Sequence, residues 1–273
     1  MSEAAVSALH VYPVKSMGGI SLPATDVTAR GLALDRRWMV VDADGDFVTQ
    51  REQPRLALCK TSVHPEALHI DAPGMPTLRV PLSPPPGARI TVRVWRSVCE
   101  AVVVSADADT WLSEYLPIPC TLVFMPEETR RAQNPDYAAG EGIVSFADGY
   151  PLLVLGEASL ADLNSRLDIS LPMNRFRPNV VAAHVPAYDE DTWARVQIGS
   201  VLFHGVKPCD RCAITTIDQD TAARGTEPLP TLAGYRRARG KVFFGQYLVP
   251  DAPGVVRVGD PIHVLMRGEA PVP

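Results

Sequence analysis

The chain has 273 residues, 46% of them hydrophobic and 21% charged, which indicates a globular protein of one large or two ordinary domains. Its 26 basic and 31 acidic residues leave a net charge of −5, which argues against nucleic acid as the main partner but allows an anionic ligand in a local basic pocket. The N-terminus lacks the pattern of a signal peptide and no apolar run has the roughly 18 residues of a membrane helix, so we expect no membrane association.

Short strand-like runs dominate the first half of the chain. An alternating run over residues 5–12 ends at a proline and two glycines, and a second strand is predicted over 20–28. Asp44-Gly45, between the runs 37–42 and 46–50, predicts a hairpin, because Asp-Gly readily adopts the positive φ of a tight turn. A helix is predicted over residues 106–116, and further strands over 56–63, 68–70, 78–81, 89–104 and 120–125.

The polar stretch 126–142 has no clear period and is the expected boundary between domains over 1–125 and 126–273. In the second half the best helix candidate spans 157–167, where leucines recur on one face. Strands are predicted over residues 143–146, 150–155, 179–184, 194–198, 201–206, 213–217, 243–249 and 255–264. This pattern predicts a β-rich α+β fold with barrel-like or sandwich-like sheets and a few helices.

Cys209 and Cys212 form a C-x-x-C motif directly before the predicted strand over 213–217. Because a thiolate is a soft metal ligand, the motif allows several interpretations: half of a zinc site, a redox disulfide, an iron–sulfur ligand pair, inert loop cysteines, or one metal-binding thiolate beside a bystander. His204 is the nearest histidine and no second C-x-x-C exists. Spacing alone leaves these alternatives open. Five cysteines, an odd number, favour a reducing cytoplasm over a secreted disulfide framework.

Several charged residues lie beside glycine or proline breaks, in the loops where functional residues concentrate. They are Lys15, Asp35, Arg36, Arg37, Arg175, Arg177, Asp210 and Arg211. Basic residues at such positions could bind a phosphate, although each one taken singly is more typical of a solvated loop charge. The acidic run 188–191 is interpreted as a solvated turn and not as a metal site. Nucleotide-binding, zincin and serine-hydrolase fingerprints are missing.

Five motifs follow one another along the chain. They are Tyr-Pro-Val-Lys-Ser at 12–16, Leu-Asp-Arg-Arg-Trp at 34–38, Phe-Arg-Pro-Asn at 176–179, Pro-Cys-Asp-Arg-Cys at 208–212 and Phe-Gly-Gln-Tyr at 244–247. With these motifs the chain resembles the MOSC-domain molybdenum-cofactor proteins, specifically the amidoxime-reducing components and their bacterial YcbX-type relatives, over about residues 5–264. The resemblance implies a MOSC N-terminal β-rich domain packed on a MOSC β-barrel-like domain with a few helices.

The resemblance also implies that a molybdenum–molybdopterin cofactor lies in a cleft between the two domains. Cys212 is the implied ligand to molybdenum and the implied catalytic residue. The positions that match cofactor-binding residues of the family are Lys15, Ser16, Arg36, Asp148, Arg177, Asp210, Arg211 and Tyr247. We expect Lys15, Arg36 and Arg177 to converge in one pocket, with Arg211 near it and favouring the thiolate of Cys212.

The implied activity is the reduction of N-hydroxylated small molecules, in which N–OH becomes N–H and water with the use of two electrons and two protons. A non-catalytic carrier of molybdenum cofactor or sulfur is the alternative, and a zinc-stabilised binding module built on Cys209, Cys212 and His204 is a third possibility. The chain shows neither the ferredoxin-like domain of some YcbX-type relatives nor the targeting segment of the mitochondrial members. We therefore expect a cytoplasmic protein with a separate electron donor of the ferredoxin, flavoprotein or cytochrome type.

Overall fold

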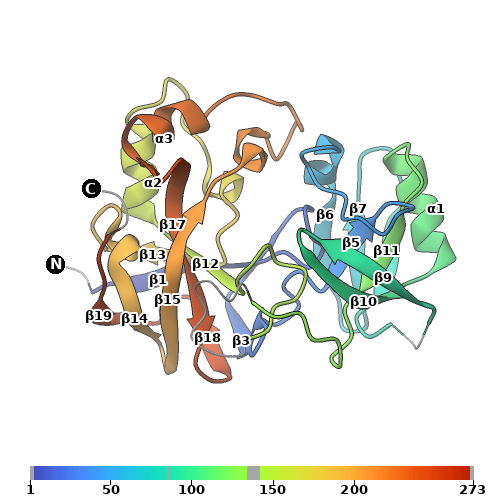
Figure 1. Cartoon of the computed structure of the whole chain (residues 1–273), viewed down its shortest axis with the longest axis horizontal. Coiled ribbons are helices and arrows are strands. Elements are labelled where there is room, and N and C mark those ends of the chain that lie inside the picture. Colours follow the sequence, from blue (N-terminus) through green and yellow to red (C-terminus); the bar gives the residue numbers. More distant parts are fainter. Residues whose placement is uncertain (1–2, 85–86, 134–141, 271–273) are drawn as a thin grey trace.

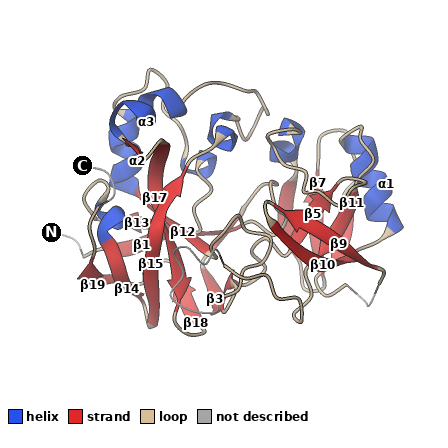
Figure 2. Cartoon of the chain, viewed as in Figure 1, coloured by secondary structure: helices blue, strands red, loops and turns tan. Residues whose placement is uncertain are grey.

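The structure is a computed structural model that describes residues 3–84, 87–133 and 142–270. Strands predominate in the described residues, and they gather in two groups that lie side by side (Figures 1 and 2). This confirms the predicted β-rich α+β fold. Within the described ranges, no helix has the length and apolar character needed to cross a membrane.

One group is built on a nine-stranded sheet whose core contains Trp193 and Phe203, both without exposed surface. Along the sheet the strands are β19 (Ile262–Arg267), β14 (Trp193–Ile198), β15 (Val201–Asp210), β17 (Lys241–Pro250), β12 (Leu152–Gly156), β13 (Val180–Ala183), β1 (Ala5–Val11) and β2 (Ile20–Leu22), with β16 (Arg237–Ala238) on β17. Helix α2 (Glu157–Asn164) connects β12 to β13, and such a crossover lets these two strands pair in parallel. Helix α3 (Leu229–Tyr235), which the sequence did not predict, contributes Leu232 to the same hydrophobic cluster as Leu163 of α2.

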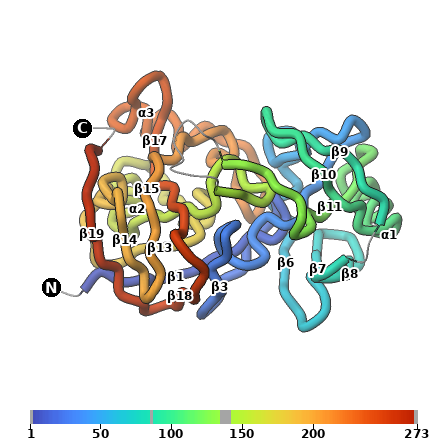
Figure 3. Tube along the Cα trace, turned by 60° about the horizontal axis from the view of Figure 1, so that its bottom comes forward, coloured from blue at the N-terminus to red at the C-terminus, as the bar shows by residue number. Residues whose placement is uncertain are grey.

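Strands near the beginning of the chain pair with strands of its second half. β1 lies beside β13, and β3 (Ala24–Thr28) lies between β4 (Gly31–Leu32) and β18 (Gly254–Arg257) in a separate three-stranded sheet. Figure 3 shows this N-terminal segment passing from β1 and β3 toward the second group of strands. Residues of the first 30 positions are therefore brought against strands that follow them by more than 150 residues. The predicted domain boundary between 125 and 126 stays a prediction.

The second group consists of two smaller sheets and helix α1 (Ala106–Tyr115). One sheet has the order β5 (Trp38–Val41), β11 (Thr121–Phe124), β10 (Ser97–Val103) and β9 (Arg89–Val94), and the other has β6 (Lys60–Val63), β7 (Ala67–Asp71) and β8 (Leu78–Pro81). Ser105 begins α1 by accepting a hydrogen bond from the backbone N–H of Ala108, as N-cap serines do. Trp111, Leu112 and Tyr115 are buried on the face of α1 that their spacing predicts.

Most predicted strands are present, but several have different bounds. Pro23 separates β2 from β3, a turn at Trp95 separates β9 from β10, and the predicted 255–264 strand is divided into β18 and β19. Residues 143–146 form no strand and only a single bridge at Ile143. The hairpin turn at Asp44-Gly45 is confirmed, and Gly45 has φ +79°. The polar stretch around the predicted boundary falls partly on residues 134–141, outside the described residues.

Two residues of the acidic run 188–191 are buried and the other two are half-buried, so the solvated-turn interpretation was wrong. Residues Asp189–Thr192 form the 3-10 helix η3, in which Glu190 and Asp191 have 0% and 4% of their surface exposed. Asp191 makes an ion pair with Arg236, and Glu190 accepts hydrogen bonds at the beginning of α2. Buried carboxylates are found where such partners offset the cost of their desolvation, and a sequence pattern does not reveal those partners.

Candidate functional site

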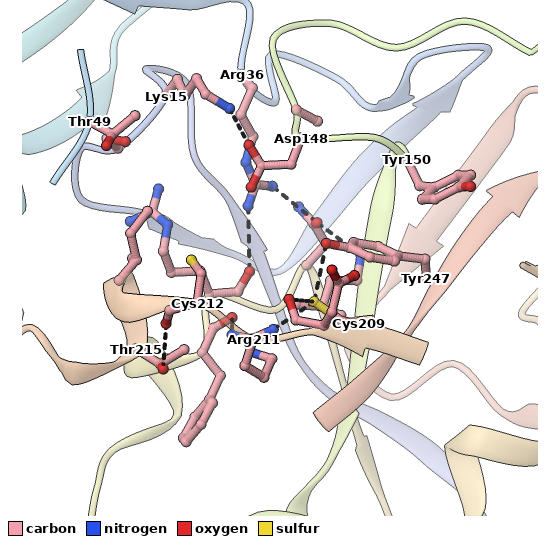
Figure 4. A pocket seen from close by; sticks show the side chains of 18 of the residues that line it. Lys15, Arg36, Thr49, Asp148, Tyr150, Cys209, Arg211, Cys212, Thr215 and Tyr247 are labelled. Carbon is pink, nitrogen blue, oxygen red and sulfur yellow. Dashed lines mark hydrogen bonds and ion pairs between the residues drawn. The ribbon is translucent and has the colours of Figure 1, made fainter. Parts of the chain in front are cut away.

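A pocket lies between the two groups of strands and has an empty volume of about 780 Å³, which includes its opening to solvent. All nine residues that the resemblance implied for the site line this pocket: Lys15, Ser16, Arg36, Asp148, Arg177, Asp210, Arg211, Cys212 and Tyr247. Figure 4 labels Lys15, Arg36, Asp148, Arg211, Cys212 and Tyr247 among them. The nine residues come from the loops after β1 and β4, from the segments before β12 and β13, from the end of β15 and the residues that follow it, and from β17. The convergence of Lys15, Arg36 and Arg177 that we expected is therefore present.

The backbone around this pocket is locally strained. Ser16, Arg36 and Arg177 adopt left-handed conformations with φ of 68°, 49° and 56°. Few residues other than glycine have positive φ, and each costs of order 1–3 kcal/mol that the surrounding structure must offset. Such strain is concentrated at ligand-binding sites, and here it turns three polar side chains of separate loops to one cavity.

Lys15 and Asp148 form an ion pair across the pocket. Lys15 is 6% exposed, and its Nζ donates to Asp148 Oδ1 at 2.6 Å and to the Phe146 carbonyl at 2.8 Å. Burial lowers the pKa of Lys15, although Asp148 opposes this effect. Burial also acts to raise the pKa of Asp148, but the charge of Lys15 outweighs it and holds that pKa below its usual value. The Asp148 carboxyl group is thus ionised at neutral pH.

Two guanidinium groups lie over the buried ring of Tyr12. Arg36 and Arg177 are 4.3 and 4.2 Å from the ring centroid. Arg36 Nη1 forms an ion pair with Asp35 at 2.5 Å, whereas Arg177 donates to the Met17 carbonyl at 2.7 Å and has no carboxylate partner among the described residues. Burial and the nearby charge of Arg36 lower the pKa of Arg177 to about 10. An anion bound here would offset this repulsion.

The two thiols of the C-x-x-C motif have different surroundings. Cys209 lies in β15 and is 4% exposed; its Sγ accepts from Arg211 Nη1 at 3.0 Å and donates to Tyr247 Oη at 3.1 Å. Burial raises the pKa of the Cys209 thiol. Cys212 is partly exposed in the pocket, and its Sγ accepts from Arg51 Nη2 at 3.3 Å.

One expectation about this motif was wrong. Residues Ala213–Thr216 form the 3-10 helix η4 in place of a strand, because the hydroxyls of Thr215 and Thr216 donate to carbonyls three residues earlier. Cys209 is part of strand β15. The Arg211 guanidinium donates a hydrogen bond to Cys209, whereas Cys212 accepts its hydrogen bond from Arg51. An electrostatic interaction with Cys212 is nevertheless among the effects that raise the pKa of Arg211, so the expected influence of Arg211 on Cys212 is present.

Asp210 lines the pocket, and two lysines neutralise the charge of its carboxylate. Its two carboxylate oxygens accept from Lys207 at 2.7 Å and from Lys241 at 2.9 Å. Burial would raise the pKa of Asp210, but these two lysines hold it below its usual value. Asp210 therefore braces β15 against β17 and leaves the pocket its excess of positive charge.

That excess consists of Arg51, Arg177 and Arg211, which have no ion pair with a carboxylate in the part of the chain that the structure describes. Arg211 also holds a buried Nε–H without a hydrogen-bond partner. Buried polar groups without partners usually indicate a missing ligand or water. The donors of this pocket thus suit an anionic group such as a phosphate, in a protein whose overall charge is negative.

The zinc interpretation is contradicted by the structure. His204 lies five residues before Cys209 on β15, which separates them by roughly 16 Å at the rise of an extended strand. His204 instead contacts Asp251. Among the described residues, no three histidine, cysteine or acidic side chains are grouped as metal ligands. All five cysteines are free thiols.

Sequence reasoning missed several residues of the pocket. Arg51, Thr49 and Asn179 line it, and Asn179 accepts from Arg36 and donates to Asp35. Arg51, which follows the first hairpin, could not be recognised from the sequence, because it contacts a residue 161 positions away, Cys212. Asn179 is the last residue of the Phe-Arg-Pro-Asn motif at 176–179. Its position in this motif was the sequence signal that could have identified it.

The comparisons with known proteins agree with this arrangement. Residues 3–119 match the MOSC N-terminal beta barrel domain and residues 141–263 match the MOSC domain. The chain is 37% identical to mitochondrial amidoxime-reducing component 1 of Mus musculus and 36% identical to that of Homo sapiens, over 95% of this chain and 82% of each relative. It is 33% identical to mitochondrial amidoxime reducing component 2 of Bos taurus, over 96% of this chain and 83% of the relative.

Proposed function

The chain belongs to the MOSC-domain family that includes the mitochondrial amidoxime-reducing components, and from this we propose that it is a molybdenum-cofactor-dependent reductase of N-hydroxylated small molecules. In this reaction the N–O bond of the substrate breaks, two electrons arrive from a donor, two protons arrive from solvent, and the oxygen leaves as water. The molybdenum cofactor would supply the oxygen-transfer chemistry, and the protein would bind and orient both reactants.

The observation that carries this proposal is the meeting of an accessible thiol with three arginines that lack carboxylate partners, all in one pocket. Cys212 is the group suited to ligate molybdenum, because its sulfur is the accessible one of the pair. Arg177 and Arg36, with Lys15 and Ser16, are suited to hold the phosphate end of the pterin. The other cofactor-binding positions in this proposal are Asp148, Asp210, Arg211 and Tyr247.

We also propose that the electrons come from a separate protein of the ferredoxin, flavoprotein or cytochrome type, and that the protein acts in the cytoplasm. The absence of nicotinamide and flavin fingerprints from the sequence supports the first proposal. The unpaired state of all five cysteines supports the second.

Elemental analysis and a dye-linked assay test the function. Protein produced in a host that makes molybdopterin should contain close to one molybdenum per chain and should reduce an amidoxime with a reduced viologen dye as the donor. NADH alone should support no turnover. Stoichiometric molybdenum without reductase activity would favour a non-catalytic carrier of cofactor or sulfur, and protein without molybdenum would contradict both functions.

A further inference from the structure

Trp95 is an unusual residue beside the pocket, where it contacts the lining residues Asp148 and Arg51. It lies in the tight turn between β9 and β10 with φ +57°, a conformation that bulky side chains rarely adopt. Its side chain is also the exception among the four tryptophans, because 47% of Trp95 is exposed whereas Trp38, Trp111 and Trp193 are at most 7% exposed. The left-handed backbone of this bulky residue motivates a hypothesis of function.

Three neighbours fix the indole in place. Its Nε1 donates to Asp148 Oδ1 at 3.0 Å, so it shares this carboxylate with Lys15 of the pocket. The ring packs against Phe47 with centroids 5.0 Å apart, and the Arg51 guanidinium lies 4.6 Å from the ring centroid. The indole is therefore an oriented surface, and its exposed part remains available to a ligand.

Arg51 connects this surface to the thiol of the site. The same guanidinium that lies over Trp95 donates to Cys212 Sγ at 3.3 Å. A flat molecule that contacts the exposed part of the indole is thus one side chain away from Cys212. Trp95 comes from the first half of the chain and Cys212 from the second, so this arrangement is complete only where the two groups of strands meet.

We propose that Trp95 is a specificity-determining residue whose exposed indole stacks against planar, uncharged N-hydroxylated substrates conjugated to an aromatic ring; this inference rests on the proposed function. Aromatic rings attract one another beyond the effect of buried area. The charge beside the indole acts in the same direction, because Arg51 lies over the ring and has no carboxylate partner in the described residues. An aryl amidoxime is neutral at pH 7, whereas its amidine product is a cation that Arg51 would repel.

Fluorescence tests the stacking without turnover. Because Trp95 is the exposed tryptophan, benzamidoxime should quench the intrinsic fluorescence of the purified holoprotein in a saturable way. Acetamidoxime, which lacks the aromatic ring, should need concentrations at least about tenfold higher. Trp95→Leu should remove the response, and Trp111→Phe, a change of a buried tryptophan in α1, should preserve it.

Steady-state kinetics test the effect on specificity. Trp95→Leu should raise KM for benzamidoxime about tenfold while leaving kcat within about twofold and KM for acetamidoxime unchanged. Trp95→Phe keeps a ring but loses the bond to Asp148, and it should restore most of the benzamidoxime KM. Equal increases of KM for both substrates, or full quenching in Trp95→Leu, would overturn the proposal. Trp95-dependent quenching in a protein that reduces no N-hydroxylated compound would support the stacking surface and contradict the proposed function alone.

Discussion

Arg51 donates a hydrogen bond to the sulfur of Cys212 at 3.3 Å, although the two residues are 161 positions apart. Arg211, the immediate neighbour of Cys212, directs its guanidinium to Cys209 at 3.0 Å. Each sulfur of the C-x-x-C motif therefore has its own arginine. This division indicates two separate roles, with Cys209 held inside the fold by Tyr247 and Cys212 presented to the pocket.

Serine substitutions should separate these roles. Serine is nearly the size of cysteine, but it offers a hard oxygen that ionises poorly. Cys212→Ser should abolish reduction of N-hydroxylated substrates, whereas Cys209→Ser should retain molybdenum and much of the activity, because a hydroxyl can still bond to Tyr247 and Arg211. Metal content and dye-linked activity of both variants provide the measurement. Equal losses would show that both sulfurs share one task, as in a redox pair.

Substitution of Arg177 should separate the stability of the cofactor-free protein from its ability to retain the cofactor. Arg177→Gln removes a buried charge that Arg36 repels, so the cofactor-free protein should become no less stable and its Tm should stay the same or rise. Removing one partner of a desolvated charge pair costs roughly 2–5 kcal/mol of binding, so the variant should lose most of its molybdopterin. Thermal melts of the cofactor-free protein and pterin content after purification measure the two effects.

Arg93→Gln is the matched control, since Arg93 is an exposed arginine paired with Asp46 on the surface. An exposed pair contributes only about 0–1 kcal/mol, so this variant should keep both its Tm and its pterin. Full pterin retention in Arg177→Gln would contradict an anion-binding role for Arg177.

The sequence predicted the elements that local pattern determines. The alternating runs and the face of α1 with Trp111 and Tyr115 are examples, and the quoted motifs located the pocket residues. Contacts between distant segments could not be predicted in this way. The hydrogen bond from Arg51 to Cys212 forms only because the two groups of strands lie side by side. The 3-10 helix η4 forms because threonine hydroxyls bond to nearby carbonyls, against the preference of threonine for strands. The buried state of Glu190 depends on partners that lie 31 and 34 positions away.

Gly205 in β15 should tolerate no side chain. A Cβ atom at this position would lie 1.6 Å from the carbonyl oxygen of Trp193, a backbone atom of the neighbouring strand that cannot move independently. Gly205→Ala should therefore destabilise the protein by about 3 kcal/mol or more, as measured by urea denaturation. Because β15 also carries Cys209, we expect the cofactor content to fall with it.

Gly234→Ala is the control for this substitution. Gly234 lies in helix α3, and no atom lies within 4 Å of the position of its added Cβ. Alanine is the better helix former by about 0.5–1 kcal/mol, so this variant should gain stability. Similar stabilities of the two variants would contradict the close approach of β14 and β15.

Glu190 is a buried carboxyl group at the beginning of α2. It accepts from the backbone N–H of Gly156 at 3.0 Å and from Ser159 Oγ at 2.9 Å, and it has no exposed surface. Burial raises its pKa from 4.5 to about 7 despite these two bonds, and the neighbouring Asp191, itself paired with Arg236, adds to the increase. The folded protein therefore holds a proton on Glu190 at pH values where the unfolded chain has released it.

This difference should make the free energy of unfolding fall as pH rises. The stabilisation from Glu190 is fully present below pH 4.5 and is lost as pH rises through about 7. The shift corresponds to about 3 kcal/mol. Glu190→Gln resembles the protonated carboxyl and should lack this dependence, so wild type should lose about 2–3 kcal/mol more than the variant between pH 5 and pH 8 in urea denaturation. Glu157 is an exposed residue in the first turn of α2, and Glu157→Gln should show the same pH dependence of the free energy of unfolding as wild type. Parallel pH curves for wild type and Glu190→Gln would show that the proton is not held at Glu190.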